Sequence, residues 1–170
     1  SDLYHYKYNF ASPVEEVSVS QCVNYLTMWS RNAPGHDLEI CFTSPGGDVI
    51  SGLVLYDTIQ ELRRAGHHIV TSTKGMAVSM AGILVQAGNI RRMSAEAWIL
   101  IHEPSFGAFG SLGAVEDRIN WVKKLEARIL DIFASRAKIS REEIEAGYKR
   151  KDWWLSSDEC FKYGFVDEVV

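Results

Sequence analysis

Cysteine is scarce in this chain: it has three in 170 residues, Cys22, Cys41 and Cys160, and none belongs to a Cys-x-x-Cys pair. An odd number of widely separated cysteines predicts neither a zinc site nor a disulfide framework. We therefore expect no bound metal and a reduced, cytoplasmic location. In that setting the three thiols pack as small buried hydrophobic side chains.

Long apolar runs and basic clusters are also missing. No run reaches the roughly 20 residues of a membrane-spanning helix, and no signal-peptide pattern is visible at the N-terminus. The net charge is −4 and the Lys and Arg residues are dispersed, so we expect neither a membrane nor a nucleic acid as a partner. Because no linker or repeat divides this ordinary globular composition, we expect a single domain over residues 1–170.

Strand-like and helix-like segments alternate through the first part of the chain. Short β-rich runs predict strands at 38–43, 67–73 and 97–102. Apolar residues at helical spacing predict helices at 49–64 and 79–88. Strands that alternate with helices across short connections predict an α/β fold with a parallel sheet and right-handed crossovers.

A helix is also predicted before the first of these strands, over "SPVEEVSVSQCVNYLTMWS". Ser12 is suited to cap it, Pro13 to occupy its first turn, and Glu15 to complete a capping box.

A long helix is predicted over 114–137, where apolar residues recur at three- and four-residue steps. Its length is on the order of 36 Å, more than a domain of this size needs for its own core. We expect it to protrude and to bury its apolar face against another subunit. The alternative is that it packs across its own sheet. Shorter helices are predicted from Ser140 and over 156–163.

The stretch "KGMAVSMAGIL" places one hydroxyl, Ser79, among small and apolar residues between a predicted strand and a predicted helix. At a helix N-terminus the free N–H groups favour developing negative charge, so the N–H of Met80 is a candidate oxyanion donor. The stretch is not a GxSxG nucleophile elbow. The alternative interpretation is an ordinary buried serine in a helix.

A serine nucleophile requires a base, and His102 at the end of an apolar strand is the best candidate. In parallel sheets, ligands bind outside the carboxyl ends of the strands. Here those ends carry Gly46–Gly47, Ser79 and His102, which we expect to meet at one edge of the sheet.

The acid that would orient the base is harder to choose. Asp152 lies between a basic run and two tryptophans, while Asp57, Asp158 and Asp167 are alternatives in plainer settings. Lys74 is close enough in sequence for a Ser–Lys dyad, but the intervening turn disfavours that geometry.

Four blocks, "TSPGGDVISGLVLYDTIQ", "GMAVSMAGILVQAG", "ILIHEP" and "DWWLSSDECFKYGFVDEV", occur in this order. Together they resemble the signature blocks of the Clp protease proteolytic subunit (ClpP), and the resemblance runs from about Leu38 to the C-terminus. It implies a crotonase-like β/α spiral in which the helix at 114–137 is a protruding handle.

The resemblance also implies a serine endopeptidase with Ser79 as nucleophile, His102 as base and Asp152 as acid. It places the oxyanion hole at the N–H groups of Gly47 and Met80. A peptide substrate would lie as an added strand between two segments. Their residues here are Gly46, Asp48 and Val49 on one side and Pro104, Ser105 and Phe106 on the other.

As partners, the resemblance implies unfolded polypeptide substrates, two heptameric rings stacked as a 14-mer, and an ATP-dependent unfoldase, with no cofactor in this chain. The family's N-terminal axial loop, which docks the unfoldase, has no clear counterpart in "SDLYHYKYNF". Alternatives are a phage or prophage head-maturation protease of the same fold, an acyl-CoA-handling crotonase relative, and a non-catalytic scaffold.

Overall fold

The computed structural model describes residues 6–170, so the first five residues of the predicted domain lie outside it. The helices and strands are β1 (Tyr6–Phe10), α1 (Glu16–Asn32), β2 (Leu38–Ser44), α2 (Val49–Arg64), β3 (Ile69–Val78), α3 (Met80–Val85), β4 (Ile90–Met93), β5 (Trp98–Ile101), α4 (Leu112–Ala134), α5 (Arg141–Tyr148), β6 (Trp153–Ser156), α6 (Ser157–Tyr163) and β7 (Glu168–Val169).

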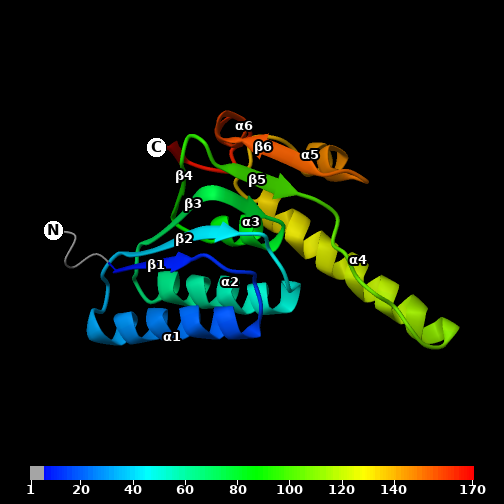
Figure 1. Ribbon diagram of the computed structural model, residues 1–170, viewed down its shortest axis with the longest axis horizontal. Helices are drawn as coiled ribbons and strands as arrows, with labels where there is room; N and C mark the ends of the chain where they lie inside the picture. The colour runs from blue at the N-terminus through cyan, green and yellow to red at the C-terminus, as the bar shows by residue number, and fades with distance from the viewer. Residues whose placement is uncertain (1–5) are drawn as a thin grey trace.

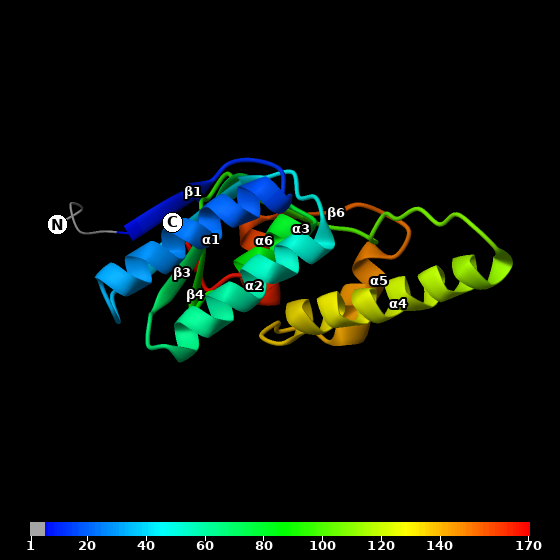
Figure 2. The ribbon, with the colours of Figure 1, turned by 90° about the horizontal axis from the view of Figure 1, so that it is seen from below.

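The strands of the described chain form one seven-stranded sheet with the order β1-β2-β3-β4-β7, which β5 joins beside β3. All pairings are parallel except that of β5 with β6. Helices α1 and α2 lie side by side against one face of the sheet (Figures 1 and 2). The predicted α/β fold with a parallel sheet is confirmed. The sequence pattern does not predict β1, β4 or β6, each only four or five residues long.

Strand β3 is ten residues long and changes neighbours along its length. Its first part pairs with β2 and β4, whereas its last three residues pair with β5. Ala77 of β3 lies opposite both Ser44, the last residue of β2, and Ile99 of β5. The carboxyl ends of β2, β3 and β5 therefore meet at one edge of the sheet.

Helix α1 begins later than its sequence pattern predicts. Its N-cap is Glu15, which forms a capping box with Ser18, so the expected capping by Ser12 is wrong. The Ser12 carbonyl instead accepts a hydrogen bond from the Ser44 hydroxyl at 2.6 Å, which ties this segment to the end of β2. Contacts with a distant strand thus override the local capping preference.

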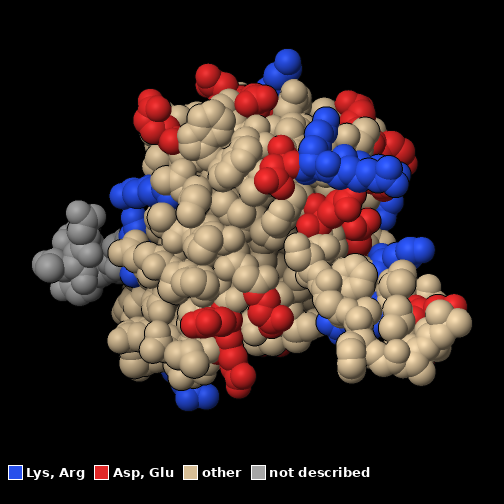
Figure 3. Space-filling model, turned by 45° about the vertical axis from the view of Figure 1, so that its right-hand side comes forward, with Lys and Arg blue, Asp and Glu red and all other residues tan. Residues whose placement is uncertain are grey.

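The predicted handle at 114–137 corresponds to α4, shifted toward the N-terminus. It starts at Leu112 because the Ser111 hydroxyl caps it by accepting a hydrogen bond from the N–H of Ala114 at 3.2 Å. Its 23 residues span about 34 Å. Helix α4 projects from the rest of the molecule (Figures 1 and 2), and its tip forms a largely uncharged projection (Figure 3). Within residues 6–170, no helix combines the length and apolar character needed to cross a bilayer.

The three cysteines are buried and form no disulfide. Burial raises the pKa of the Cys22 and Cys160 thiols to about 12. These two thiols are therefore protonated at neutral pH and pack as hydrophobic groups, as expected.

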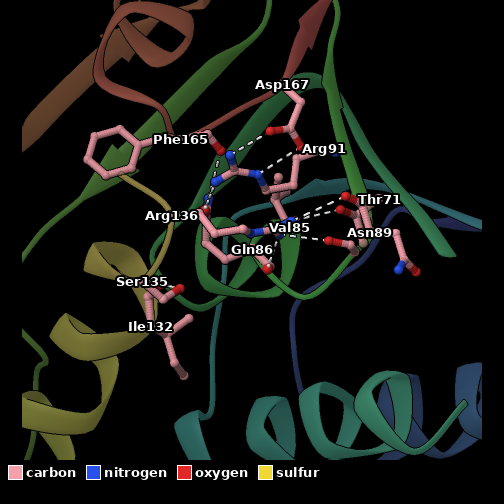
Figure 4. Close-up of polar contacts among 11 residues, drawn as sticks. Thr71, Val85, Gln86, Asn89, Arg91, Ile132, Ser135, Arg136, Phe165 and Asp167 are labelled. Atoms are coloured by element: carbon pink, nitrogen blue, oxygen red, sulfur yellow. Dashed lines mark hydrogen bonds and ion pairs between the residues drawn. The ribbon is translucent and has the colours of Figure 1, made fainter. Parts of the chain in front are cut away.

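A network of buried polar groups fixes the C-terminal end of α3 (Figure 4). Arg91 is 2% exposed, and its guanidinium donates hydrogen bonds to both carboxylate oxygens of Asp167 and to the Gln86 side chain. Arg136, just beyond α4, donates to three carbonyl groups within residues 86–89 at 2.7–3.2 Å. These bonds provide partners for the carbonyl of Gln86, the C-cap of α3, and for two carbonyls of the segment that follows the helix.

Replacing Asp167 with Asn should lower the free energy of unfolding by about 3 kcal/mol at pH 7, because it leaves the buried Arg91 cation unpaired. Burial raises the pKa of Asp167, but the hydrogen bonds from Arg91 outweigh burial and hold that pKa below its ordinary value of 3.8. The ion pair therefore contributes stability above pH 3.8, and this stability is lost as the pH falls through the lowered folded-state pKa.

Urea unfolding of both proteins over a pH series measures this effect. The difference between wild type and Asp167→Asn should shrink as the pH falls below 3.8, and a difference independent of pH would contradict the assignment. Asp131→Asn is the matched control, since its partner Arg141 is exposed, and it should leave stability nearly unchanged.

Candidate active site

Ser79 lies between β3 and α3, half-buried, with φ 56° and ψ −118°. A positive φ is rare outside glycine, costs on the order of 1–3 kcal/mol and is concentrated at functional sites. The Ser79 N–H donates to the carbonyl of Leu100 at 2.9 Å, which ties the turn to the end of β5. The chain lacks a GxSxG motif, yet its backbone makes the same kind of strained strand-to-helix turn that presents a nucleophile.

The glycine pair after β2 passes directly beside this turn. Gly46 has φ +84°, and a Cβ atom placed on it would overlap the Val78 carbonyl oxygen. The same Cβ would lie 3.1 Å from the Ser79 Cβ and 3.3 Å from the Met80 nitrogen. Only glycine permits so close an approach of the two segments.

An isolated parallel bridge between Val14 and Gly47 holds this glycine pair in place. The Val14 N–H donates to the Gly46 carbonyl at 2.9 Å, and the Asp48 N–H donates to the Val14 carbonyl at 2.7 Å. The bridge does not use the N–H of Gly47, which leaves that donor for another partner.

His102 and Asp152 lie opposite each other just beyond the β5–β6 ladder. The antiparallel register pairs Ile101 with Trp153, so His102 and Asp152 are the next two residues across. The His102 Nδ1 is 3.6 Å from the Asp152 Oδ1, and Asp152 is 64% exposed. Within residues 6–170, no other carboxylate comes within ion-pair distance of His102, and no hydrogen bond joins the Ser79 hydroxyl to its ring.

The other candidates from the sequence do not reach this site. Asp167 pairs with the buried arginine described above, and the structure shows no contact of Asp57 or Asp158 with His102. Lys74 lines a separate cavity that Ser79 does not line.

Glu103, which sequence patterns do not single out, links the segments that carry His102 and Asp152. Its carboxylate accepts a hydrogen bond of 2.8 Å from the backbone N–H of Arg150, which has φ 58°. Glu103 directly follows His102, and Arg150 lies two residues before Asp152. Because the partners are 47 residues apart, no local spacing could have indicated this contact.

Ser79 and His102 line a common cavity of about 220 Å³. Four other predicted site residues also line it: Gly47, Val49, Pro104 and Ser105. A second cavity of about 140 Å³ shares these four and adds Asp48 and Phe106. The predicted residues Gly46, Met80 and Asp152 line neither cavity, although Gly46 and Met80 adjoin Ser79 and Asp152 adjoins His102. No group of three or more His, Cys, Asp or Glu in residues 6–170 is arranged to hold a metal ion.

A sequence profile of the family described as Clp protease matches residues 5–170. The chain belongs to the Clp protease family. Curated relatives carry the name ATP-dependent Clp protease proteolytic subunit. That of Bacteroides fragilis is 35% identical over 139 residues, which is 81% of this chain and 65% of that protein. The protein of Bacteroides thetaiotaomicron is 34% identical over 139 residues, 81% of this chain and 61% of that protein. The protein of Deinococcus radiodurans is 29% identical over 161 residues, which is 94% of this chain and 77% of that protein.

This Clp protease family chain thus spans less than two-thirds of the length of the Bacteroides relatives. The family resemblance expected from the four sequence blocks is confirmed, and the parallel α/β architecture is consistent with the crotonase-like fold of the family.

Proposed function

We propose that this Clp protease family member is a serine endopeptidase, a single peptidase domain over residues 1–170, that cleaves unfolded polypeptides through an acyl-enzyme. The observation that carries the proposal is the placement of Ser79, in a strained turn, on the same cavity as His102, whose ring faces Asp152. Ser79 is the nucleophile, His102 the base and Asp152 the acid that orients the base.

The orientation of the His102 ring supports one proton path. The Nδ1 of His102 faces Asp152, so Nε2 takes the proton of Ser79 as its oxygen attacks the substrate carbonyl. His102 returns this proton to the leaving amine as the C–N bond breaks, and water then hydrolyses the acyl-enzyme by the same route. Catalytic hydrogen bonds tighten when substrate binds. The distance of 3.6 Å between the His102 Nδ1 and the Asp152 Oδ1 should therefore shorten to about 2.8 Å in the complex.

The oxyanion hole consists of the N–H groups of Gly47 and Met80. Met80 is the first residue of α3, where backbone N–H groups have no partner within the helix. The N–H of Gly47 is not used by the bridge to Val14. Gly46 brings the two segments together, since its Cα region lies against Ser79 and Met80. Two donors aimed at one oxygen stabilise the tetrahedral intermediate.

The substrate binds as an added strand between two segments, 46–49 and 104–106. These segments border the second cavity, which shares four lining residues with the cavity at Ser79. Added strands are recognised mainly through backbone hydrogen bonds, which accept many side chains.

Assembly into stacked rings, as the family resemblance suggests, would cover the tip of α4. Phe109 and Leu112 are fully or largely exposed there, and Ile119 and Trp121 are partly exposed along the helix. An exposed apolar surface of this kind favours contact with a second copy. We propose two heptameric rings around a closed chamber in the cytoplasm, with ATP dependence supplied by a partner unfoldase.

A fluorophosphonate probe tests the proposal, because it reacts with serines that a neighbouring base activates. The assembled protein should take up one probe per chain, located at Ser79 by peptide mass mapping, and His102→Ala should abolish the labelling. Sedimentation on the same samples measures the size of the assembly.

Assembled wild-type protein that remains unlabelled would overturn the serine-peptidase proposal in favour of a scaffold or an acyl-CoA-handling relative. Labelling that survives His102→Ala would remove His102 from the role of base.

A further inference from the structure

The cavity beside Ser79 has apolar walls and one carboxylate. Much of its apolar lining comes from Ile83 of α3, Ile101 of β5, and Ile129, Leu130 and Phe133 of α4. Glu126 of α4 lines it as well.

Glu126 faces the cavity because of its helical spacing. It precedes Ile129, Leu130 and Phe133 by three, four and seven residues, which places all four side chains on one face of α4. The helix therefore adds an acidic group to an otherwise hydrophobic stripe, half-buried where a charge is costly without a partner.

In the described part of the chain, no cation forms an ion pair with the carboxylate of Glu126. Burial is the largest cause that raises the pKa of Glu126, and the negative charges of Glu103 and Glu145 raise it further. The positive charge of Lys149 lowers this pKa, but its effect is the smallest of the four. Burial, followed by the charge of Glu126, also raises the pKa of Tyr148, another residue of the cavity wall, to about 12. The cavity is thus an environment that favours a cation.

We propose that Glu126 selects substrates with Arg or Lys at the residue whose carbonyl Ser79 attacks, the P1 residue. This inference rests on the proposed peptidase function and adds a substrate class to it. The P1 side chain leaves the backbone beside the attacked carbon, so it enters the cavity that Ser79 and His102 line. The alkyl stem of Arg or Lys packs on the apolar walls, and its cationic end pairs with the Glu126 carboxylate.

Peptides that differ only at P1 test this inference. Acetyl-Ala-Leu-Arg-aminomethylcoumarin is compared with its citrulline counterpart, which has nearly the same shape without the charge. For the wild-type protein, kcat/KM should be about tenfold or more higher for Arg. Glu126→Gln should bring the Arg-to-citrulline ratio to about one, and Glu126→Lys should reverse the preference toward a Glu-containing peptide.

Glu116→Gln is the matched control, because Glu116 lies on the exposed part of the same helix and does not line the cavity. It should leave the ratio unchanged. A ratio near one in the wild-type protein, or a ratio that Glu126→Gln does not alter, would refute the role of Glu126.

A binding measurement separates this result from failure of the proposed peptidase function. The cleaved product acetyl-Ala-Leu-Arg and its citrulline counterpart are titrated into the Ser79→Ala protein by calorimetry. The Arg product should bind about tenfold more tightly, and adding Glu126→Gln should remove the difference. Equal binding of both products would refute the inference even if no peptide were cleaved. An unlabelled and inactive protein that still prefers the Arg product would refute only the peptidase proposal.

Discussion

Replacing Ser79 with Ala should lower kcat/KM for an unstructured peptide about 10,000-fold or more, to the residual rate that binding and the oxyanion hole support. Alanine has no oxygen to form the acyl-enzyme, so the step that Ser79 carries is lost rather than slowed. The fold should be unaffected, because the structure shows no hydrogen bond of the Ser79 side chain. Steady-state cleavage of a fluorogenic peptide gives the rate, and sedimentation shows whether the assembly is retained.

Ser20→Ala, on the exposed side of α1, is the matched control and should retain full activity. When catalytic residues act as one unit, the losses of activity caused by their separate substitutions do not add in the double variant. The double variant of Ser79 and His102 to Ala should therefore be no less active than Ser79→Ala alone. Losses that multiply, or a Ser79→Ala protein within tenfold of wild type, would show that the two side chains do not act together.

Replacing Gly46 with Ala should damage both stability and activity. The backbone at φ +84° costs about 1–2 kcal/mol for any residue with a Cβ. Overlap with the Val78 carbonyl oxygen adds to this, for a total of about 3–4 kcal/mol of unfolding free energy. Relief of the overlap displaces Ser79 and Met80, and a misplacement of about 1 Å can cost on the order of 100-fold in rate.

Gly35→Ala separates the two causes. Gly35 has φ +74°, close to that of Gly46, but nothing lies within 4 Å of its Cβ position. It should lose about 1–2 kcal/mol through the backbone alone and keep its activity. Urea unfolding and kcat/KM of both variants give the comparison. If the two variants lose equal stability, the close approach of Gly46 to the Ser79 turn is not the constraint that we infer.

Residues at the ends of the parallel strands could be located from the sequence. Gly46, Ser79 and His102 each follow an apolar strand, and parallel strands bring their carboxyl ends to one edge. Asp152 could be assigned only from the family resemblance. It follows no parallel strand and lies opposite His102 because β6 pairs antiparallel with β5, a pairing that no local pattern indicates.

Local signals were misleading where a distant segment supplied a competing partner. Ser12, Pro13 and Glu15 form a reasonable helix start, yet α1 begins at Glu16 because the segment before it pairs with the end of β2. For Glu126, by contrast, the sequence contains no local signal of its position in the structure. In the sequence it is one charged residue on an amphipathic helix, and only the packing of α4 against α3 and α5 places it on the cavity wall.

The sequence by itself determined the α/β class, the strand ends that carry Ser79 and His102, and the family, because these follow from periodicity and from short motifs whose residues are close in the chain. The tertiary structure decided the strained turn at Ser79, the pairing of His102 with Asp152, the tether from Glu103 to Arg150 and the acidic cavity wall. Each of these depends on atoms brought together from segments far apart in the chain, or on a backbone conformation that their packing imposes. Neither the contacts between distant segments nor the imposed backbone conformation can be recognised from a local sequence pattern.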